Sequence, residues 1–383
     1  MIKIAAIFGT RPDTIKLAPV INEIKKHKKE FRITTIATAQ HREMLDQVLD
    51  VFKIKPDYDL NIMKPGQSLA LVTRNIIDLL DAILIKEKPD LILVQGDTTT
   101  TFAASLAAFY RKIPVGHVEA GLRTDDKYNP FPEEINRRLT GVISELHFAP
   151  TETSQKALLK ENTPAAHIYI TGNTVIDALN IAVKKNYKFT DNTLRKILGN
   201  GRQNILITMH RRENWGMPMK NACRAVKKMA LEFPEHNFIF PVHLNPLVKE
   251  TVHSVLAGMP NVFLINPLDY LEFTNLMSKC ILIITDSGGV QEEGPHFGIP
   301  ILVLREKTER PEAVKYGTVK LVGLNEERIY KTAKNLLKNK RAYNKMASAV
   351  NPYGDGLASQ RIVKILRNYF GLSAEKVKQF IPK

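Results

Sequence analysis

The chain has 383 residues, 44% of them hydrophobic and 25% charged, which is an ordinary globular composition on a length that suits two domains. No apolar run approaches the roughly 20 residues of a membrane-spanning helix, and the first residues are too short and too strand-like for a signal peptide. The formal net charge is +16, but residues 331–383 alone hold twelve Lys/Arg against Asp355 and Glu375, on an amphipathic helical pattern. We therefore expect a solvated basic face, with neither a nucleic-acid partner nor membrane insertion.

The predicted elements alternate between short β-branched runs and helical stretches, which is typical of parallel sheets built from βαβ units. Strands of the first half are expected at Ile2–Phe8, Arg32–Ala39, Leu91–Gln95, Pro114–Val118 and Leu146–Phe148. Those of the second half are expected at Asn204–Met209, Phe238–Val242, Val262–Ile265, Ile281–Thr285, Ile301–Leu304 and Val319–Val322. A polar, irregular stretch from about Gly172 to Gly201 separates the halves. The sequence thus predicts an α/β protein with two doubly wound, Rossmann-like domains facing a cleft.

Most of the unusual polar clusters come directly after predicted strands, where open α/β sheets bind their ligands. They are Arg11, Gln40-His41, Asp97 and Glu119 in the first half, and His210-Arg211-Arg212, His243, Ser287-Gly288-Gly289 and Arg305 with Arg310 in the second. This distribution predicts a site in each domain and a ligand shared between them.

Two of these turns are suited to an anionic ligand. In Phe8-Gly9-Thr10-Arg11-Pro12 a strand ends and a helix begins, so free N–H groups and a fixed cation lie together. In the second half, Gly288 and Gly289 would let backbone N–H groups approach a phosphate, and Glu293 could accept ribose hydroxyls. A well-made turn and a serine N-cap are the structural alternatives. Together the two turns favour a nucleotide diphosphate.

Three carboxylates are candidates for acid/base work. Asp97 either takes part in catalysis or caps the next helix, and Glu119 ends a buried strand, where an unused acid is costly. Glu133 and Glu134 precede Arg137 and Arg138 by one turn, so they are either functional or ordinary first-turn acids paired at i,i+4. We find no convincing metal-ligand spacing and no nicotinamide-binding GxGxxG turn, so no metal and no cofactor is expected.

Cys223 and Cys280 are far apart and lack metal-ligand spacing. Cys280 opens the apolar run Cys280–Ile284, which predicts a buried, reduced thiol. We therefore expect a reducing, cytoplasmic location.

The chain resembles the non-hydrolysing UDP-N-acetylglucosamine 2-epimerases over nearly its whole length. The residues that carry the resemblance are Phe8-Gly9-Thr10-Arg11-Pro12, Gln40-His41-Arg42-Glu43-Met44-Leu45, Gly96-Asp97-Thr98-Thr99-Thr100-Thr101, His117-Val118-Glu119-Ala120-Gly121-Leu122-Arg123, Pro132-Glu133-Glu134, Gly172-Asn173-Thr174, His210-Arg211-Arg212-Glu213-Asn214, Pro241–Pro246, Asp286-Ser287-Gly288-Gly289, Thr308–Glu312 and Asn351–Gly356. The chain departs from the usual family residues at Asp13-Thr14, Met209, Gly294 and His296.

The resemblance implies a glycosyltransferase-B-like fold, with residues 1–170 and a returning helix at 357–383 in one domain and residues 171–356 in a UDP-binding domain. It implies that Asp97, Glu119 and Glu133 are catalytic acids and that His210 is essential beside the diphosphate. The residues implied for substrate or nucleotide binding are Arg11, Lys16, His243, Phe273, Ser287, Gly288, Gly289, Glu293 and Arg310.

The implied reaction interconverts UDP-N-acetylglucosamine and UDP-N-acetylmannosamine by eliminating UDP to a 2-acetamidoglucal and adding it back. It would supply N-acetylmannosamine units for cell-surface polysaccharide. A hydrolysing epimerase, a glycosyltransferase of the same fold and a nucleotide-sugar sensor remain alternatives. The resemblance also implies a homodimer. Some bacterial relatives bind a second UDP-N-acetylglucosamine, and the residues that match that site here are Gln40, Glu134, His210 and Arg211. At the same possible regulatory site, Glu43 stands where glutamine can occur, and Gly66 where some relatives have arginine. We predict weak or absent activation by substrate.

Overall fold

The computed structural model describes residues 1–39, 42–64 and 66–382, except for the side chains of residues 42–44. The chain divides into two compact units. Unit 1 comprises Met1–Ile181 and Tyr353–Pro382, and unit 2 comprises Ala182–Pro352. Within the described ranges, no helix is both long and apolar enough to cross a membrane.

Unit 1 is built on a parallel sheet of seven strands in the order β3-β2-β1-β4-β5-β6-β7. The strands are β1 (Ile2–Phe8), β2 (Phe31–Ala37), β3 (Tyr58–Asp59), β4 (Leu91–Gln95), β5 (Val115–Val118), β6 (Leu146–Ala149) and β7 (Ile168–Ile170). Every residue of β4, β5 and β6 is buried, as expected for parallel strands covered on both faces. Because all strands run the same way, their carboxyl ends form one edge of the sheet.

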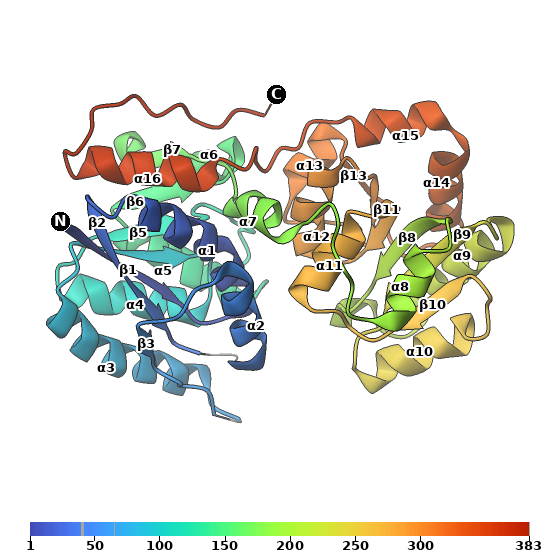
Figure 1. Cartoon of the computed structure of the whole chain (residues 1–383), viewed down its shortest axis with the longest axis horizontal. Helices are drawn as coiled ribbons and strands as arrows, with labels where there is room; N and C mark the ends of the chain where they lie inside the picture. The colour runs from blue at the N-terminus through green and yellow to red at the C-terminus, as the bar shows by residue number, and fades with distance from the viewer. Residues whose placement is uncertain (40–41, 65, 383) are drawn as a thin grey trace. The chain divides into compact units, whose positions relative to one another are not determined.

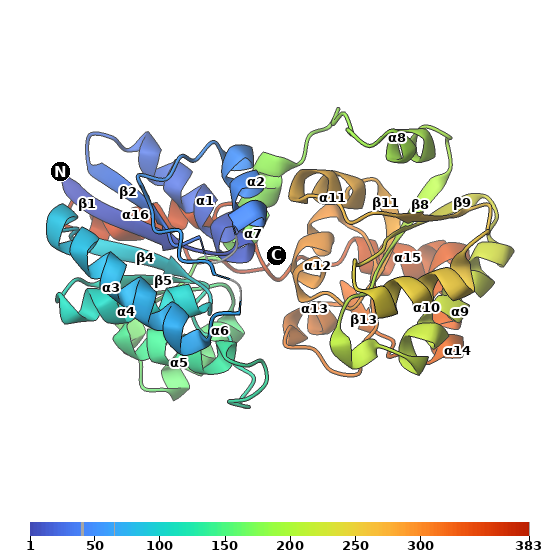
Figure 2. The same ribbon diagram turned by 90° about the horizontal axis from the view of Figure 1, so that it is seen from below.

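Helices cover both faces of this sheet (Figure 2). α3 (Leu69–Glu87), α4 (Thr99–Tyr110) and α5 (Glu133–Ile143) lie side by side on one face, and α1 (Arg11–Lys26), α2 (Arg42–Phe52) and α16 (Ala358–Tyr369) lie on the other. The remaining helices of the unit are α6 (Glu152–Lys160), α7 (Thr174–Ala182) and the short η1 (Ala165–His167). Ile7, Ile36, Ile76 and Leu80 belong to the buried core between sheet and helices.

Unit 2 has a parallel sheet of six strands in the order β10-β9-β8-β11-β12-β13. The strands are β8 (Gln203–Thr208), β9 (His236–Pro241), β10 (Val262–Ile265), β11 (Cys280–Thr285), β12 (Ile301–Val303) and β13 (Val319–Leu321). The helices are α8 (Asn192–Leu198), η2 (Arg212–Asn214), α9 (Met217–Glu232), α10 (Pro246–Leu256), α11 (Tyr270–Met277), α12 (Gly288–Glu293), η3 (Gly294–Phe297), α13 (Pro311–Tyr316), α14 (Glu326–Lys338) and α15 (Lys340–Ala347). The unit therefore repeats the doubly wound plan with its own core.

The predicted α/β class with two Rossmann-like units is confirmed, and all eleven predicted strands are present with ends shifted by a few residues. Sequence analysis missed β3 and β7, because two or three residues are too few to show an alternating pattern. The division between the units falls after Ile181 rather than at residue 170. The reason is that α7 packs on unit 1, where Asp177 accepts hydrogen bonds from the backbone N–H groups of Ala358 (3.2 Å) and Ser359 (2.8 Å).

The end of the chain returns to unit 1, and α16 lies against α1 (Figure 1). Asp177 caps the start of α16, and Arg367 near its end pairs with Glu30 at 2.8 Å. The basic residues of 331–382 are divided among α14 and α15 of unit 2, α16 of unit 1 and the non-helical segment after α16, which holds Lys376 and Lys378.

Candidate functional site

Each sheet has one topological switch point, at which the connections after two neighbouring strands lead to opposite faces of the sheet. A crevice therefore opens at the carboxyl ends of these two strands. In unit 1 the switch lies between β1 and β4, and in unit 2 between β8 and β11. Arg11 and Asp97 follow the first pair of strands, whereas His210 and Ser287 follow the second. The predicted site residues of each unit therefore meet at the position where this fold binds ligands.

The turn from β1 to α1 is closed by Asp13. Its carboxylate accepts hydrogen bonds from the backbone N–H groups of Gly9 (3.1 Å) and Thr10 (2.8 Å), and burial raises its pKa to about 6. A side chain at Gly9 would overlap the hydroxyls of Thr38 and Thr100, so this position requires glycine. Arg11 opens α1 and is half-buried. The departure at Asp13 thus forms part of the turn that presents Arg11.

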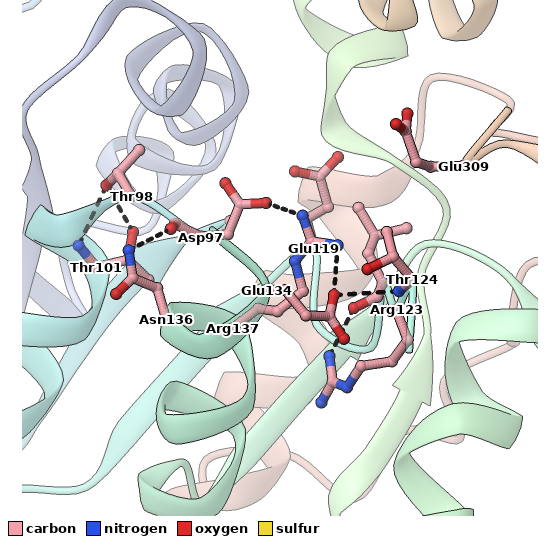
Figure 3. A network of polar contacts seen from close by, with 12 residues as sticks. Asp97, Thr98, Thr101, Glu119, Arg123, Thr124, Glu134, Asn136, Arg137 and Glu309 are labelled. Atoms are coloured by element: carbon pink, nitrogen blue, oxygen red, sulfur yellow. Dashed lines mark hydrogen bonds and ion pairs between the residues drawn. The ribbon is translucent and has the colours of Figure 1, made fainter. Parts of the chain in front are cut away.

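Asp97 is presented by a turn of unusual backbone. Gly96 has φ +71°, a left-handed conformation that favours glycine, and its carbonyl accepts a 2.7 Å hydrogen bond from Nε2 of the buried His117. Arg137 donates to the Asp97 carboxylate at 2.5 Å, and the side-chain amide of Asn136 donates to its carbonyl at 3.0 Å (Figure 3). Asp97 does not cap α4, because Thr98 does so through the N–H of Thr101. The helix-cap alternative for Asp97 is therefore wrong.

His117 is held neutral by its surroundings. Burial lowers its pKa to about 3, and the neighbouring His147, with a pKa lowered to about 4 by burial, adds to the effect. A carbonyl oxygen only accepts, so the proton of His117 is on Nε2. Sequence analysis did not identify His117 as part of the site, although it is one of the residues in the family motif.

The adjacent acids Glu133 and Glu134 differ completely in their environment. Glu134 is fully buried and accepts hydrogen bonds from Arg138 (2.9 Å), Arg137 (3.2 Å) and the backbone N–H of Thr124 (3.1 Å), as Figure 3 shows in part. Oε2 of Glu133 is also buried but has no hydrogen-bond partner among the residues that the structure describes. Burial raises the pKa of Glu133, and the charge of Asp97 raises it further, against the opposing effect of Arg137. The i,i+4 pairing expected for these acids therefore applies to Glu134 alone.

Glu119 is the centre of a buried network. It forms an ion pair with Lys16 and accepts hydrogen bonds from the side-chain amides of Gln95 and Asn173, the latter at 2.8 Å. Its backbone has φ +65°, which is uncommon for a residue with a side chain. Both carboxylate oxygens are engaged, so this acid is arranged to hold neighbouring groups in place. Gln95 and Asn173 are site residues that sequence analysis missed.

In unit 2 the site is organised by Asp286, which is fully buried. Its carboxylate accepts hydrogen bonds from the backbone N–H groups of His210 (3.1 Å) and Arg211 (3.0 Å) and from the side chain of Asn214 (2.9 Å). Nδ1 of His210 lies 3.3 Å from the same carboxylate, and the His210 ring stacks on His243 with centroids 6.2 Å apart. The side chain of His210 is 46% exposed, so its other edge is accessible. Asp286 stands in the family motif but was not predicted as a site residue.

Arg310 lies against the first turn of α12. Its Nε pairs with Glu292 at 2.7 Å and its Nη1 with Glu309 at 3.1 Å. A Cβ at Gly288 would lie 2.8 Å from Nη1 of Arg310, so a side chain at this position would displace the guanidinium. The loop of Arg310 is joined to α12 by the hydrogen bond from Thr308 to Gln291 at 2.7 Å. The structure thus brings together Gly288 and Arg310, two residues predicted to hold the nucleotide.

The other predicted residues lie on the same parts of each unit. Ser287 occupies the N-cap position of α12 without a side-chain cap bond, Gly289 and Glu293 belong to that helix, and Phe273 is half-buried on α11. Arg211 donates from Nε to the carbonyl of Asp286 at 2.9 Å. Gln40 lies outside the described residues, and the side chain of Glu43 is not described. Among the residues with a described structure, no group of acids, histidines or cysteines is arranged to hold a metal ion.

Two doubly wound parallel α/β units, each with charged residues at its switch point, define a Rossmann-like α/β protein that binds its ligands at these points. The model of the family described as UDP-N-acetylglucosamine 2-epimerase matches residues 22–367. A UDP-N-acetylglucosamine 2-epimerase of Bacillus subtilis is 52% identical over 382 residues, covering 100% of this chain and 99% of that protein. The chain belongs to the UDP-N-acetylglucosamine 2-epimerase family and is therefore an isomerase.

Solved structures agree with this assignment. A crystal structure of the Neisseria meningitidis enzyme bound to UDP-GlcNAc has a TM-score of 0.86 and 52% identity, covering 96% of this chain and 100% of that one. The enzyme of Methanocaldococcus jannaschii has a TM-score of 0.81 and 35% identity, with the same coverage of 96% and 100%.

Proposed function

We propose that this protein interconverts UDP-N-acetylglucosamine and UDP-N-acetylmannosamine, in the cytoplasm, and so supplies N-acetylmannosamine units for cell-surface polysaccharide. Relatives that match the whole chain are named UDP-N-acetylglucosamine 2-epimerases, and the Neisseria meningitidis structure is described as bound to UDP-GlcNAc. The observation that carries the proposal is the pair Asp97 and Glu133, in which one acid is held by Arg137 and the other has a raised pKa. Such a pair suits proton removal and return at one carbon.

The C2 hydrogen of the sugar has no adjacent carbonyl, so a side-chain base cannot remove it directly. It becomes acidic when the C1–O bond breaks and positive charge develops at C1. The first requirement is therefore to stabilise the departing UDP. We assign this to His210, Arg310 and the backbone N–H groups of Ser287–Gly289 in unit 2, with Arg11 of unit 1 as an additional cation. In the same proposal Glu293 accepts ribose hydroxyls, Phe273 lies near uracil, and His243 supports the ring of His210.

The second requirement is proton transfer at C2. A carboxylate takes the C2 proton, which leaves a 2-acetamidoglucal and UDP, and the proton and UDP are then returned to give the epimer. Glu133 suits the acid/base role because burial raises its pKa, and Asp97 is the second candidate. Glu119 is fully engaged with Lys16, Gln95 and Asn173, so we assign it to holding Lys16 rather than to moving the proton. This chemistry requires neither a metal nor a nicotinamide.

The test is incubation with UDP-N-acetylglucosamine in heavy water, followed by NMR of the products. We expect UDP-N-acetylmannosamine with deuterium at C2, because a carboxylic acid exchanges its proton with solvent between turnovers. Free N-acetylmannosamine and UDP would identify a hydrolysing epimerase, and turnover that needs an added acceptor would identify a glycosyltransferase. Complete epimerisation with protium retained at C2 would exclude the elimination mechanism.

We also propose that the protein is a homodimer whose two copies meet on the helices α3, α4 and α5. These helices lie side by side and expose large apolar side chains, among them Phe109 (58%), Tyr110 (65%) and Val142 (85%). Apolar patches of this kind mark interfaces more often than solvated surfaces. Size-exclusion chromatography with light scattering should give twice the chain mass, and Val142→Asp should shift it towards the monomer. A monomeric wild-type protein would contradict this proposal.

A further inference from the structure

Asn173 connects three parts of unit 1 through a single buried residue. Its side-chain oxygen accepts a hydrogen bond from the N–H of Val175 (3.0 Å), at the start of α7. Its side-chain amide donates to Glu119 at 2.8 Å, and its backbone N–H donates to the carbonyl of Tyr353 at 2.6 Å. The residue is 2% exposed. It therefore joins α7, a site carboxylate and the segment that re-enters unit 1.

The chain passes between the units twice: Asn173 precedes the helix that leads to the first passage, and it is bonded to Tyr353 at the second. The first comes at the end of α7, between Ile181 and Ala182, and the second lies between Pro352 and Tyr353. We call Tyr353–Gly356 the return segment. It is fixed on unit 1 by the ion pair of Asp355 with Arg361, which also donates to the carbonyl of Thr171 at 3.0 Å.

The return segment is packed tightly against Asn173 and α7. A Cβ at Gly354 would lie 3.1 Å from Ile176 and 3.3 Å from the carbonyl oxygen of Asn173. A Cβ at Gly356 would overlap the side-chain amide of Asn180. A displacement of the return segment must therefore move Asn173 or open a gap beside it, because close-packed groups cannot absorb it otherwise.

Glu119 depends on its neighbours for its orientation. A left-handed backbone is unfavourable for a residue with a side chain, so the φ of +65° must be held by surrounding contacts. Those contacts are Lys16, Gln95 and Asn173. Asn173 is also bonded to the return segment, through its backbone N–H and the carbonyl of Tyr353.

We propose that Asn173 is a positioning residue that fixes the Glu119 carboxylate and, through it, the side chain of Lys16. A displacement of the return segment then moves both side chains, because Asn173 is bonded to that segment. The inference rests on the proposed function in so far as Glu119 and Lys16 belong to the active site. Any rearrangement of the chain where it passes between the units then alters the charged pair directly. Helix capping alone would not require the amide group, since serine and aspartate cap helices as well as asparagine does.

This difference gives the first experiment, with variants Asn173→Ser and Asn173→Asp. Both keep a capping oxygen for α7, but serine lacks the amide that holds Glu119, and aspartate places a second carboxylate against it. We expect kcat to fall roughly 10-fold for the serine variant, because one hydrogen bond to a charged group is lost. For the aspartate variant we expect a fall of roughly 100-fold or more, because that bond is replaced by repulsion between two carboxylates. Lowering the pH should partly restore the aspartate variant, because one shared proton relieves the repulsion. The matched control is Asn325→Ser, at the N-cap of α14, which should keep wild-type kcat.

A measurement that does not need turnover separates this inference from the proposed function. Hydrogen exchange of the full-length protein should be faster around Val118–Gly121 in both Asn173 variants than in the wild type, and unchanged there in Asn325→Ser. That result would stand even if the wild type did not epimerise UDP-N-acetylglucosamine. Wild-type exchange and wild-type kcat in both Asn173 variants would reduce the residue to a cap and overturn the proposal.

The second experiment changes only the return segment. Gly354→Ala presses a methyl group against Ile176 and the carbonyl of Asn173, and no site residue is altered. Gly199→Ala is the matched control, since its Cβ would meet a backbone oxygen at a similar 3.1 Å on the remote α8. We expect Gly354→Ala to lower kcat several-fold and to speed exchange around Val118–Gly121, with no change for Gly199→Ala. Wild-type values for Gly354→Ala would overturn the coupling to the return segment.

Discussion

The two units have the same topology at their switch points but place their charges in opposite order. In unit 1 the more exposed member of the pair Asp97–Arg137 is the acid, with side chains 28% and 9% exposed. In unit 2 the more exposed members are the cations, because His210 and Arg310 are backed by the buried acids Asp286 and Glu292. At the pair Asp97–Arg137 the first unit therefore exposes a carboxylate, whereas at the pairs of His210 and Arg310 the second unit exposes cations.

Under the proposed function, this difference divides one reaction between two units of the same fold. A carboxylate backed by arginine stays close to a reacting carbon as an acid/base group, whereas a cation tethered by a buried acid is held ready for phosphate. The strands supply the position, and the identity of a few residues after each strand decides the chemistry.

The largest effect is expected from removing the acids of unit 1. Asp97→Asn and Glu133→Gln should each lower kcat by at least ~100-fold, the lower end of general acid/base contributions. The Kd for UDP, measured by calorimetry, should stay near the wild-type value because the proposed phosphate-binding groups belong to unit 2. A large loss of UDP affinity in either variant would show that the division of roles is wrong.

The second effect concerns the neutral histidine behind Asp97. The pKa of His117 is about 3 in the folded protein and near 6.5 unfolded, so the unfolded chain binds the proton first as pH falls. The stability from a neutral His117 is present above about pH 6.5 and is lost as pH falls towards 3. At pH 5 the loss is about 2 kcal/mol relative to pH 7.5, from the pKa difference alone.

His117→Gln removes this titration. Urea unfolding followed by circular dichroism should show the stability gap between wild type and variant shrinking by about 2 kcal/mol between pH 7.5 and pH 5. The single tryptophan, Trp215, lies in unit 2, so its fluorescence serves as the control and should report the same midpoint in both proteins. A gap independent of pH would mean that His117 is not held neutral.

The third prediction addresses unit 2. Asp286→Asn keeps the shape of the side chain but sets an NH₂ group against donors from His210, Arg211 and Asn214. We expect UDP to bind roughly 10-fold more weakly, about the value of one charged hydrogen bond. Asp97→Asn is the control in the same titration. Equal UDP affinity for Asp286→Asn and the wild type would remove Asp286 from the proposed site.

The fold and much of the site could be predicted from the sequence because their signals are local. Buried parallel strands appear as apolar runs, and polar residues directly after them mark the carboxyl edge. The roles of adjacent acids could not be predicted in this way. Glu133 and Glu134 follow the same proline and precede the same arginines, yet only the packing of α5 shows which one the arginines hold.

The supporting residues were missed for the same reason. Asn173 lies 54 positions from Glu119, and Asp286 lies 76 positions from His210, so their contacts depend on sheet order rather than on spacing. His117 occupies a buried strand, where a core histidine is the ordinary interpretation. The motif residues were visible in the sequence, but what each one holds was not.

The fourth prediction tests the arginine between the two acids. The positive charge of Arg137 lowers the pKa of Glu133, so Arg137→Met should raise that pKa and move the acid limb of the kcat profile to higher pH. Loss of the bond to Asp97 should also lower kcat by roughly 10-fold. Arg138→Met is the matched control, because Arg138 also binds Glu134 but does not contact Asp97. An unchanged or lower acid limb in Arg137→Met would contradict the assignment of Glu133.

The smallest effect is expected from substrate acting as an activator. Of the residues that match the second ligand site of some relatives, Glu134 has both oxygens engaged by Arg137, Arg138 and Thr124, and Arg211 already donates to Asp286. A second UDP-N-acetylglucosamine would have to displace these contacts, and the position of Gly66 offers no side chain to compensate. Each charged hydrogen bond lost would cost about 1.5–3 kcal/mol, so a single such loss is already comparable to a typical allosteric coupling of about 1–3 kcal/mol. In the reverse direction, initial rates against UDP-N-acetylmannosamine should therefore be hyperbolic, and trace UDP-N-acetylglucosamine should change them by less than ~5-fold, the lower end of typical couplings. Sigmoidal rates that the trace forward substrate makes hyperbolic would show that the second site forms in spite of these contacts.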